Sequence, residues 1–116
     1  MKKLILVVEN DEGTKDILKK LFETKNINIV SIDNSNDVMN FLKTVKPDCI
    51  LAGNYFPNSI SGIELGLKLK ETNIPFILFS GYQDIVKKAR KEGIVCFQKP
   101  YVKSFVHFVT ELLKKG

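Results

Sequence analysis

The chain has 116 residues, of which 44% are hydrophobic, and this is enough to fill one core without disulfides or metal ions. Its formal net charge of +5 comes from lysines scattered among acidic residues, with Arg90 as the single arginine, which argues against a nucleic-acid-binding face. No apolar run approaches the roughly 20 residues of a membrane span, and the chain turns polar too soon after Met1 for a signal peptide. We therefore expect one cytoplasmic domain over residues 1–116, without membrane contact.

The first third of the chain alternates strand-like and helix-like segments. Residues 4–8 form a continuous apolar run with β-branched members, which is typical of a strand covered on both faces. Residues 12–25 predict an amphipathic helix with lysines on its outer side. Four residues at helical spacing are expected on its inner face: Ile17, Leu18, Leu21 and Phe22. Residues 27–32 predict a second strand.

The middle of the chain continues this alternation. A helix is predicted over residues 34–45, behind Asn and Ser residues that can cap it. Residues 48–52 predict a third strand, and residues 61–72 predict the helix that follows it. Residues 75–80 predict a fourth strand.

The last third of the chain ends the pattern with two more helices and one more strand. A short helix after the fourth strand is expected to end at Gly93, since glycine readily adopts the conformation that terminates a helix. Residues 94–97 predict the fifth strand, and residues 102–113 predict the last helix. The residues expected in the core from this last helix are Phe105, Phe108, Val109 and Leu112.

Strands that alternate with helices through short connections predict a parallel sheet with helices on both faces. The carboxyl ends of parallel strands meet at one edge of such a sheet, where ligands bind. The candidate site therefore consists of the residues that directly follow the strands: Glu9, Asn10, Asp11, Gly53, Asn54, Ser80, Gly81, Lys99 and Pro100.

Four segments, in this order and at matching separations, resemble the receiver domains of bacterial and archaeal response regulators. They read LILVVEND, KPDCILAGNYFP, IPFILFSG and GIVCFQKP, and the resemblance covers essentially the whole chain. Single-domain regulators of the chemotaxis type are the most similar kind. The resemblance implies a flavodoxin-like α/β fold, with a doubly wound five-stranded parallel sheet of order 2-1-3-4-5 and five helices on its two faces.

The resemblance also implies roles for the residues at the sheet edge. In this family an acid pair binds Mg²⁺ together with a phosphoacceptor aspartate, while a hydroxyl group and a lysine hold the phosphoryl group. Glu9 and Asn10 stand at the positions of the acid pair, Gly53 at that of the acceptor, Ser80 at that of the hydroxyl and Lys99 at that of the lysine.

Two of these positions depart from the family's pattern. Gly53 has no side chain, so no acyl phosphate can form there, and Asn10 offers an oxygen atom without a negative charge. Glu9 and Asp11 remain as the acids that face Lys99. We therefore expect a degenerate phosphorylation pocket that does not accept a phosphoryl group.

The same departures bear on the metal ion. Mg²⁺ is usually held through carboxylates, and this pocket has lost two of them. We expect no cofactor, and at most a weak ion site formed by Glu9, Asn10 and the backbone of Tyr55. The resemblance further implies that Pro100 follows a cis peptide bond.

Two interpretations of Lys99 stay open. It either pairs with Glu9 across the pocket or is a solvated lysine, because a partly exposed pair contributes only about 0–1 kcal/mol. Ser80 is expected to bond a local backbone group rather than a ligand. His107 is expected at the surface of the last helix.

Cysteine and aromatic residues near the site also carry predictions. Cys49 and Cys96 are expected to be free thiols, and Cys96 takes the place of the aromatic residue that the family usually has three positions before its lysine. Tyr55 and Phe56 are expected to be tucked against their loop. If they were exposed, they would form an aromatic binding spot.

The preferred hypothesis is a pseudo-receiver, a module of a two-component-type system that binds a protein partner, independently of aspartyl phosphorylation, and is not an enzyme. The partner would be a histidine kinase or another signalling protein. It would dock on the surface formed by the fourth helix, the fifth strand and the fifth helix, whose basic segment over residues 82–93 suits an acidic partner. Two alternatives are a phosphorylatable response regulator with an atypical acceptor or metal site, and a flavodoxin-like domain that binds a small ligand beside Gly53.

Overall fold

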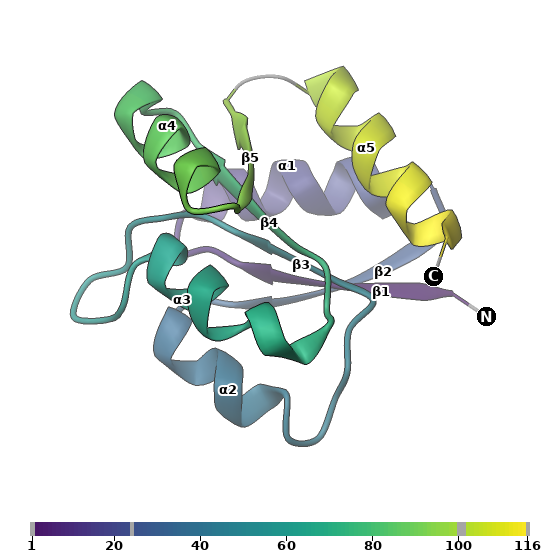
Figure 1. The fold of residues 1–116 in the computed structure, drawn as a ribbon. Coiled ribbons are helices and arrows are strands. Elements are labelled where there is room, and N and C mark those ends of the chain that lie inside the picture. The colour runs from purple at the N-terminus through teal and green to yellow at the C-terminus, as the bar shows by residue number, and fades with distance from the viewer. Residues whose placement is uncertain (1, 24, 100–101, 116) are drawn as a thin grey trace.

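The computed structural model describes residues 2–23, 25–99 and 102–115. Parallel strands form one five-stranded sheet in the order β2-β1-β3-β4-β5 (Figure 1). The strands are β1 (Lys3–Val8), β2 (Ile27–Ile32), β3 (Cys49–Ala52), β4 (Phe76–Ser80) and β5 (Val95–Gln98). The predicted fold class and strand order are thus confirmed, and each predicted strand lies within one residue of its observed bounds.

Five α-helices connect and follow the strands within the described residues. They are α1 (Glu12–Glu23), α2 (Val38–Phe41), α3 (Gly62–Lys68), α4 (Gln83–Lys91) and α5 (Val102–Lys115). Two short 3-10 helices, Ser35–Asp37 and Lys70–Thr72, extend α2 and α3. Gly93 follows α4 with a φ of 79°, the left-handed conformation expected of a glycine that ends a helix.

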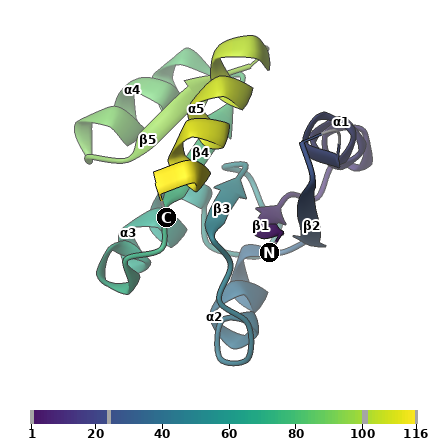
Figure 2. The ribbon, with the colours of Figure 1, turned by 90° about the vertical axis from the view of Figure 1, so that its right-hand side faces the viewer.

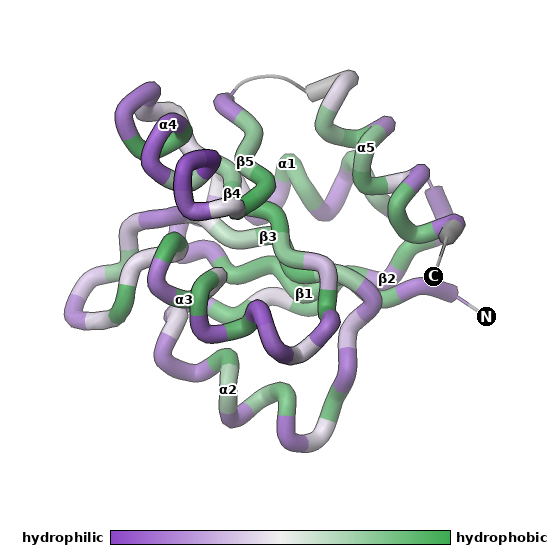
Figure 3. Tube along the Cα trace, viewed as in Figure 1, coloured by the Kyte–Doolittle hydropathy of each residue, from purple (hydrophilic) through white to green (hydrophobic). Residues whose placement is uncertain are grey.

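The helices cover the two faces of the sheet separately. Helices α1 and α5 lie on one face, and α2, α3 and α4 lie on the other (Figures 1 and 2). Side chains of a strand point alternately to opposite faces, so β1 supplies Ile5 and Val7 to the core under α1 and α5, and Leu6 and Val8 to the other core. Strands β1 and β3 are therefore buried on both sides, and Figure 3 shows their hydrophobic character in green.

Two predicted helices are shorter than expected. The segment predicted as a helix over residues 34–45 has a 3-10 turn and then a single α-helical turn that ends at Phe41. The Thr44 hydroxyl donates to the Phe41 carbonyl at 3.3 Å, and such side-chain bonds compete with a regular helix. The segment over residues 61–72 leaves α-helical geometry after Lys68 and ends in the 3-10 turn, which buries no side chain.

Helix α1 buries fewer of its apolar side chains than their helical spacing predicted. Leu18 and Phe22 are buried, whereas Ile17 is 57% exposed, so the prediction for Ile17 is wrong. In α5, Phe105 and Val109 are buried as predicted. The other two predicted core residues, Phe108 and Leu112, are only partly buried. Leu113, which was not predicted in the core, is buried instead. No described helix has the length and apolar character needed to cross a bilayer.

Candidate functional site

The residues that follow the strands meet at the carboxyl edge of the sheet. They surround a cavity of about 160 Å³. Its lining includes most of the predicted site residues together with their neighbours: Glu9, Asn10, Gly53, Asn54, Tyr55, Phe79, Ser80, Gly81, Tyr82 and Lys99. Pro100 and its peptide bond lie outside the described residues, and Asp11 does not line the cavity.

The Glu9 carboxylate lies at the base of this cavity and is only 7% exposed as a residue. It accepts a hydrogen bond from the Asn10 backbone N–H at 3.2 Å, and its Oε1 lies 3.6 Å from Lys99 Nζ. Burial raises the pKa of Glu9, while Lys99 and the Asn10 N–H act against that rise. Of the two interpretations of Lys99, the structure therefore supports the pair with Glu9.

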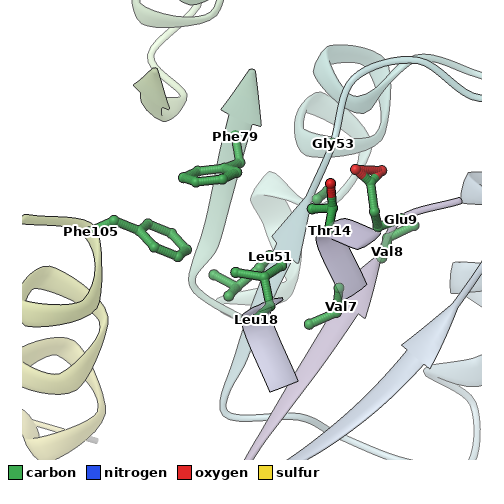
Figure 4. A pocket seen from close by; sticks show the side chains of 10 residues that line it. Val7, Val8, Glu9, Thr14, Leu18, Leu51, Gly53, Phe79 and Phe105 are labelled. Atoms are coloured by element: carbon green, nitrogen blue, oxygen red, sulfur yellow. The ribbon is translucent and has the colours of Figure 1, made fainter. Parts of the chain in front are cut away.

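The surroundings of Glu9 explain why burial dominates its pKa. Beneath the carboxylate, a small cavity of about 10 Å³ is lined mostly by apolar side chains, among them Val7, Leu51, Phe79 and Phe105 (Figure 4). These side chains offer no dipole to a carboxylate, so the charged form loses hydration without full compensation.

Lys99 is held from its backbone as well as from its side chain. Its N–H donates to the Ser80 carbonyl at 2.9 Å, which fixes the end of β5 beside the end of β4. Its Nζ lies 5.5 Å from the centre of the Phe79 ring, within the range of a cation–π contact. The lysine thus approaches Glu9 along the face of an aromatic ring.

Ser80 bonds a local backbone group, as predicted. Its Oγ accepts from the Tyr82 N–H at 3.2 Å, and the residue is 5% exposed. Tyr82 is the residue from which α4 begins. Ser80 therefore links the site to the start of α4.

Asp11 has a different role from the one predicted. Its Oδ2 accepts from the Thr14 N–H at 2.9 Å and from the Thr14 hydroxyl at 2.7 Å, which closes the first turn of α1. These two bonds lower the pKa of Asp11, and the side chain is exposed. Asp11 is engaged in capping α1 and is not paired with Lys99.

The loop from β3 to α3 is fixed by Asn54, a predicted site residue, together with residues that the sequence did not single out. The Asn54 carbonyl accepts from the Gly62 N–H at 2.8 Å, and Asn54 Oδ1 accepts from the Ile63 N–H at 3.1 Å. A Cβ at Gly62 would lie 2.1 Å from the Gly53 carbonyl oxygen, so only glycine fits there. Ser61 and Glu64 form a capping box at the start of α3, and their S-x-x-E spacing is the signal that could have indicated it.

The two aromatic residues of this loop behave differently. Phe56 is 3% exposed and packs in the core, as predicted, but Tyr55 is 76% exposed. A phenol can stay hydrated at its hydroxyl end, whereas a phenyl ring gains more from burial. Tyr55 and Tyr82, which is 73% exposed, both border the cavity.

The cysteines and the histidine lie where the sequence predicted. Cys49 and Cys96 are buried free thiols, and His107 is exposed on α5. The Cys96 carbonyl accepts two hydrogen bonds from the Arg90 guanidinium, from Nε at 3.3 Å and from Nη2 at 3.0 Å. Nothing in the sequence analysis indicated this link between α4 and β5.

The oxygen donors at this edge do not match the Mg²⁺ site that the resemblance implies. Glu9 is turned toward Lys99, Asp11 is turned toward Thr14, and Gly53 contributes no side chain. Within the described residues, no three His, Cys, Asp or Glu side chains gather closely enough to hold a metal ion. A small dication that needs near-octahedral oxygen ligands therefore lacks most of its protein donors here.

Comparison with solved structures finds the same fold in several proteins. The signal receiver domain of a signal transduction histidine kinase from Syntrophus aciditrophicus is 24% identical, with a TM-score of 0.86 over 97% of this chain and 91% of that one. The response regulator TrrA of Thermotoga maritima, solved in complex with Mg²⁺ and BeF, is 18% identical, with a TM-score of 0.83 over 95% and 98% of the two chains. A CheY-like receiver domain from Methylobacillus flagellatus is 18% identical, with a TM-score of 0.80 over 97% and 99%.

Sequence comparison identifies the family. No protein with a curated description matches the chain significantly. The family model described as the response regulator receiver domain matches residues 5–105, which is most of the chain. The chain therefore belongs to the response regulator receiver domain family, the signalling modules of two-component systems.

Proposed function

We propose that residues 1–116 act as one pseudo-receiver module that signals by binding another protein, without aspartyl phosphorylation. The observation that carries this proposal is Gly53, which stands at the end of β3 with its N–H bonded to the Val8 carbonyl at 3.0 Å. Register with β1 leaves Gly53 as the residue directly after the strand, and a glycine offers no carboxylate to a phosphoryl donor. The module would act by contact and not as an enzyme.

The donor set supports a module that works without Mg²⁺. Phosphoryl transfer between anions needs a cation to neutralise charge on the transferred group. Asn10 and Gly53 supply no carboxylate and the charge of Glu9 is already paired with Lys99, so little uncompensated negative charge is left to draw a dication into the cavity. We propose that the protein carries no cofactor.

The exposed side chains of α4 and β5 support a docking surface for an acidic partner. Helix α4 presents Lys87, Lys88 and Lys91 to solvent, and Val95 on the edge strand β5 is 44% exposed. A basic helix beside an exposed apolar residue complements an acidic surface with an apolar centre. We propose that a histidine kinase or another signalling protein docks on the face formed by α4, β5 and α5.

Incubation with acetyl phosphate and Mg²⁺, followed by intact-mass measurement, tests the proposal. We expect no acid-stable or acid-labile gain of one phosphoryl group by the parent protein. We expect Gly53→Asp combined with Asn10→Asp to gain one, because these two changes return both carboxylates to the sheet edge. Asn10→Asp alone is the matched control, since it adds charge without an acceptor. A phosphoryl group on the parent, located by peptide mapping, would overturn the proposal and support the alternative of an atypical acceptor.

The structure does not favour the alternative in which a small ligand fills the space beside Gly53. Although Gly53 lines the cavity, the place that its missing side chain would take is not open, because the Glu9 carboxylate lies against it. A ligand that entered there would have to displace a buried carboxylate from its lysine. The protein-binding function is therefore the one that the site supports best.

A further inference from the structure

The Glu9 carboxylate occupies the space into which a side chain at position 53 would project. A Cβ on Gly53 would lie 2.7 Å from Glu9 Oε2, 3.2 Å from Oε1 and 3.3 Å from Cδ. The separation of 2.7 Å from Oε2 is shorter than a carbon atom tolerates, so a residue with any side chain at position 53 would require the carboxylate to shift. Figure 4 shows the carboxylate beside Gly53 at the end of β3.

Several contacts keep the carboxylate in this place. The Glu9 backbone N–H donates to the Ile32 carbonyl at 3.0 Å, which anchors the residue to the end of β2. The side chain, 9% exposed, accepts from the Asn10 N–H and faces Lys99. A carboxylate that burial disfavours keeps its position only when such partners compensate.

We propose that Glu9 is a built-in replacement for the acceptor carboxylate: it fills the acceptor's place above Gly53 and neutralises Lys99 from within the chain. In this arrangement the lysine already has the anionic partner that a phosphorylated or acidic residue at position 53 would supply. The inference rests on the proposed function, since it takes the pocket to be one that no phosphoryl group enters.

The arrangement has a path to the proposed docking surface. The Lys99 N–H bonds the Ser80 carbonyl, and the Ser80 Oγ accepts from the Tyr82 N–H, at the start of α4. These bonds join the backbone of the residue that pairs with Glu9 to the first turn of α4.

Gly53→Ala is the direct test, because it adds only the atom that would meet the carboxylate. We expect it to shift the Glu9 carboxylate away from Gly53 and toward solvent. Carbon-13 NMR of the side-chain carboxyls should then show that the raised pKa of Glu9 falls toward that of an ordinary glutamate, and the backbone amide signals of Asn10 and Lys99 should shift. Gly81→Ala is the matched control: this glycine lines the same cavity, but nothing lies within 4 Å of the Cβ that it would gain.

Glu9→Gln provides a second test, which does not require the fold to accommodate an added side-chain atom. It keeps the shape of the side chain and removes its charge, so we expect the Lys99 signals to shift while the Gly53 amide stays near its parent position. Unchanged Lys99 signals in Glu9→Gln, or an unchanged Glu9 titration in Gly53→Ala, would overturn the proposal.

The outcomes separate this inference from the proposed function. If the parent protein takes up a phosphoryl group but its NMR signals show the coupling of Glu9, Gly53 and Lys99, the function fails and the internal replacement stands. If the parent takes up none and the coupling is absent, the replacement fails and the function stands.

Discussion

The Arg90 guanidinium donates two hydrogen bonds to the Cys96 carbonyl and so fastens α4 to β5. We expect Arg90→Ala to lower the free energy of unfolding by about 1 kcal/mol, the size of a partly exposed charge-assisted bond. Arg90→Lys should recover less than half of this loss, because an ammonium group cannot reproduce the planar fork. Urea denaturation measures both. Lys91→Ala, on the same exposed helix, is the control, and an equal loss in that variant would argue against a specific link.

The buried thiols supply a second reporter of the same link. Burial raises the pKa of Cys49 to about 12 and raises that of Cys96 as well, although the charge of Arg90 acts against the rise at Cys96. Since the thiolate is the reactive form, we expect both to react slowly with a disulfide reagent at pH 8 and rapidly once the protein is unfolded. In folded Arg90→Ala the lost positive charge should raise the pKa of Cys96 further, so Cys96 should react more slowly than in the parent, and Cys49 should be unchanged. Equal acceleration of both thiols would indicate global unfolding instead.

Much of the fold could be predicted because its strands are continuous apolar runs. Neighbouring residues such as Ile5 and Leu6 point to opposite cores, so both must be apolar. The resulting apolar run can be recognised in a single sequence. Helix lengths were less predictable, because the α-helix predicted over residues 61–72 ends at Lys68 and is followed by a 3-10 turn that buries no side chain. Ile17 follows the same spacing as Leu18, yet the width of the covered stripe depends on where α5 packs.

The site was predictable in its members but not in its contacts. Strand ends in a parallel sheet must meet, so Glu9, Ser80 and Lys99 could be placed together from sequence order alone. That Asp11 would close the first turn of α1, or that Glu9 would lie on Gly53, depends on side-chain rotamers and local packing. Neither residue type nor spacing specifies these.

Glu9→Gln should change how stability depends on pH. A carboxyl group with a raised folded-state pKa contributes its full stability below its unfolded-state pKa and loses it as the pH rises through the folded-state value. The charged form of Glu9 therefore costs stability at neutral pH, and the glutamine does not. We expect Glu9→Gln to raise the free energy of unfolding at pH 7 by up to about 1 kcal/mol. The gain stays this small because the variant also loses the pair with Lys99.

Thermal unfolding at several pH values measures this effect. The advantage of Glu9→Gln should shrink as the pH falls toward 4, where Glu9 becomes neutral in the parent too. Glu71→Gln, at an exposed acid in the 3-10 turn after α3, serves as the control. A Glu9→Gln variant that is less stable than the parent at pH 7 would mean that the pair with Lys99 outweighs the cost of burial.

Gly62→Ala should be among the most damaging small substitutions in this chain. The new Cβ would lie 2.1 Å from the Gly53 carbonyl oxygen and 2.5 Å from Leu78 Cδ1. The clash with a backbone atom cannot be relieved by a side-chain rotation, so α3 must move away from the end of β3. We expect a loss of roughly 3 kcal/mol, the upper part of the range for overpacking. Equilibrium denaturation measures it, with Gly81→Ala as a control that should cost little.

Gly53→Asp alone should place two carboxylates in one buried space. The Cβ of the aspartate would lie only 2.7 Å from the present position of Glu9 Oε2, so both groups cannot be charged and stay close at neutral pH. We expect this variant to be less stable than the parent by about 2 kcal/mol at pH 7, with the difference narrowing at pH 5 because one carboxyl takes up a proton.

Millimolar Mg²⁺ should raise the melting temperature of Gly53→Asp with Asn10→Asp, since the cation relieves the repulsion, and should leave that of the parent unchanged. Differential scanning fluorimetry with and without Mg²⁺ measures these shifts, and an equal Mg²⁺ effect on the parent would show that the cation binds elsewhere.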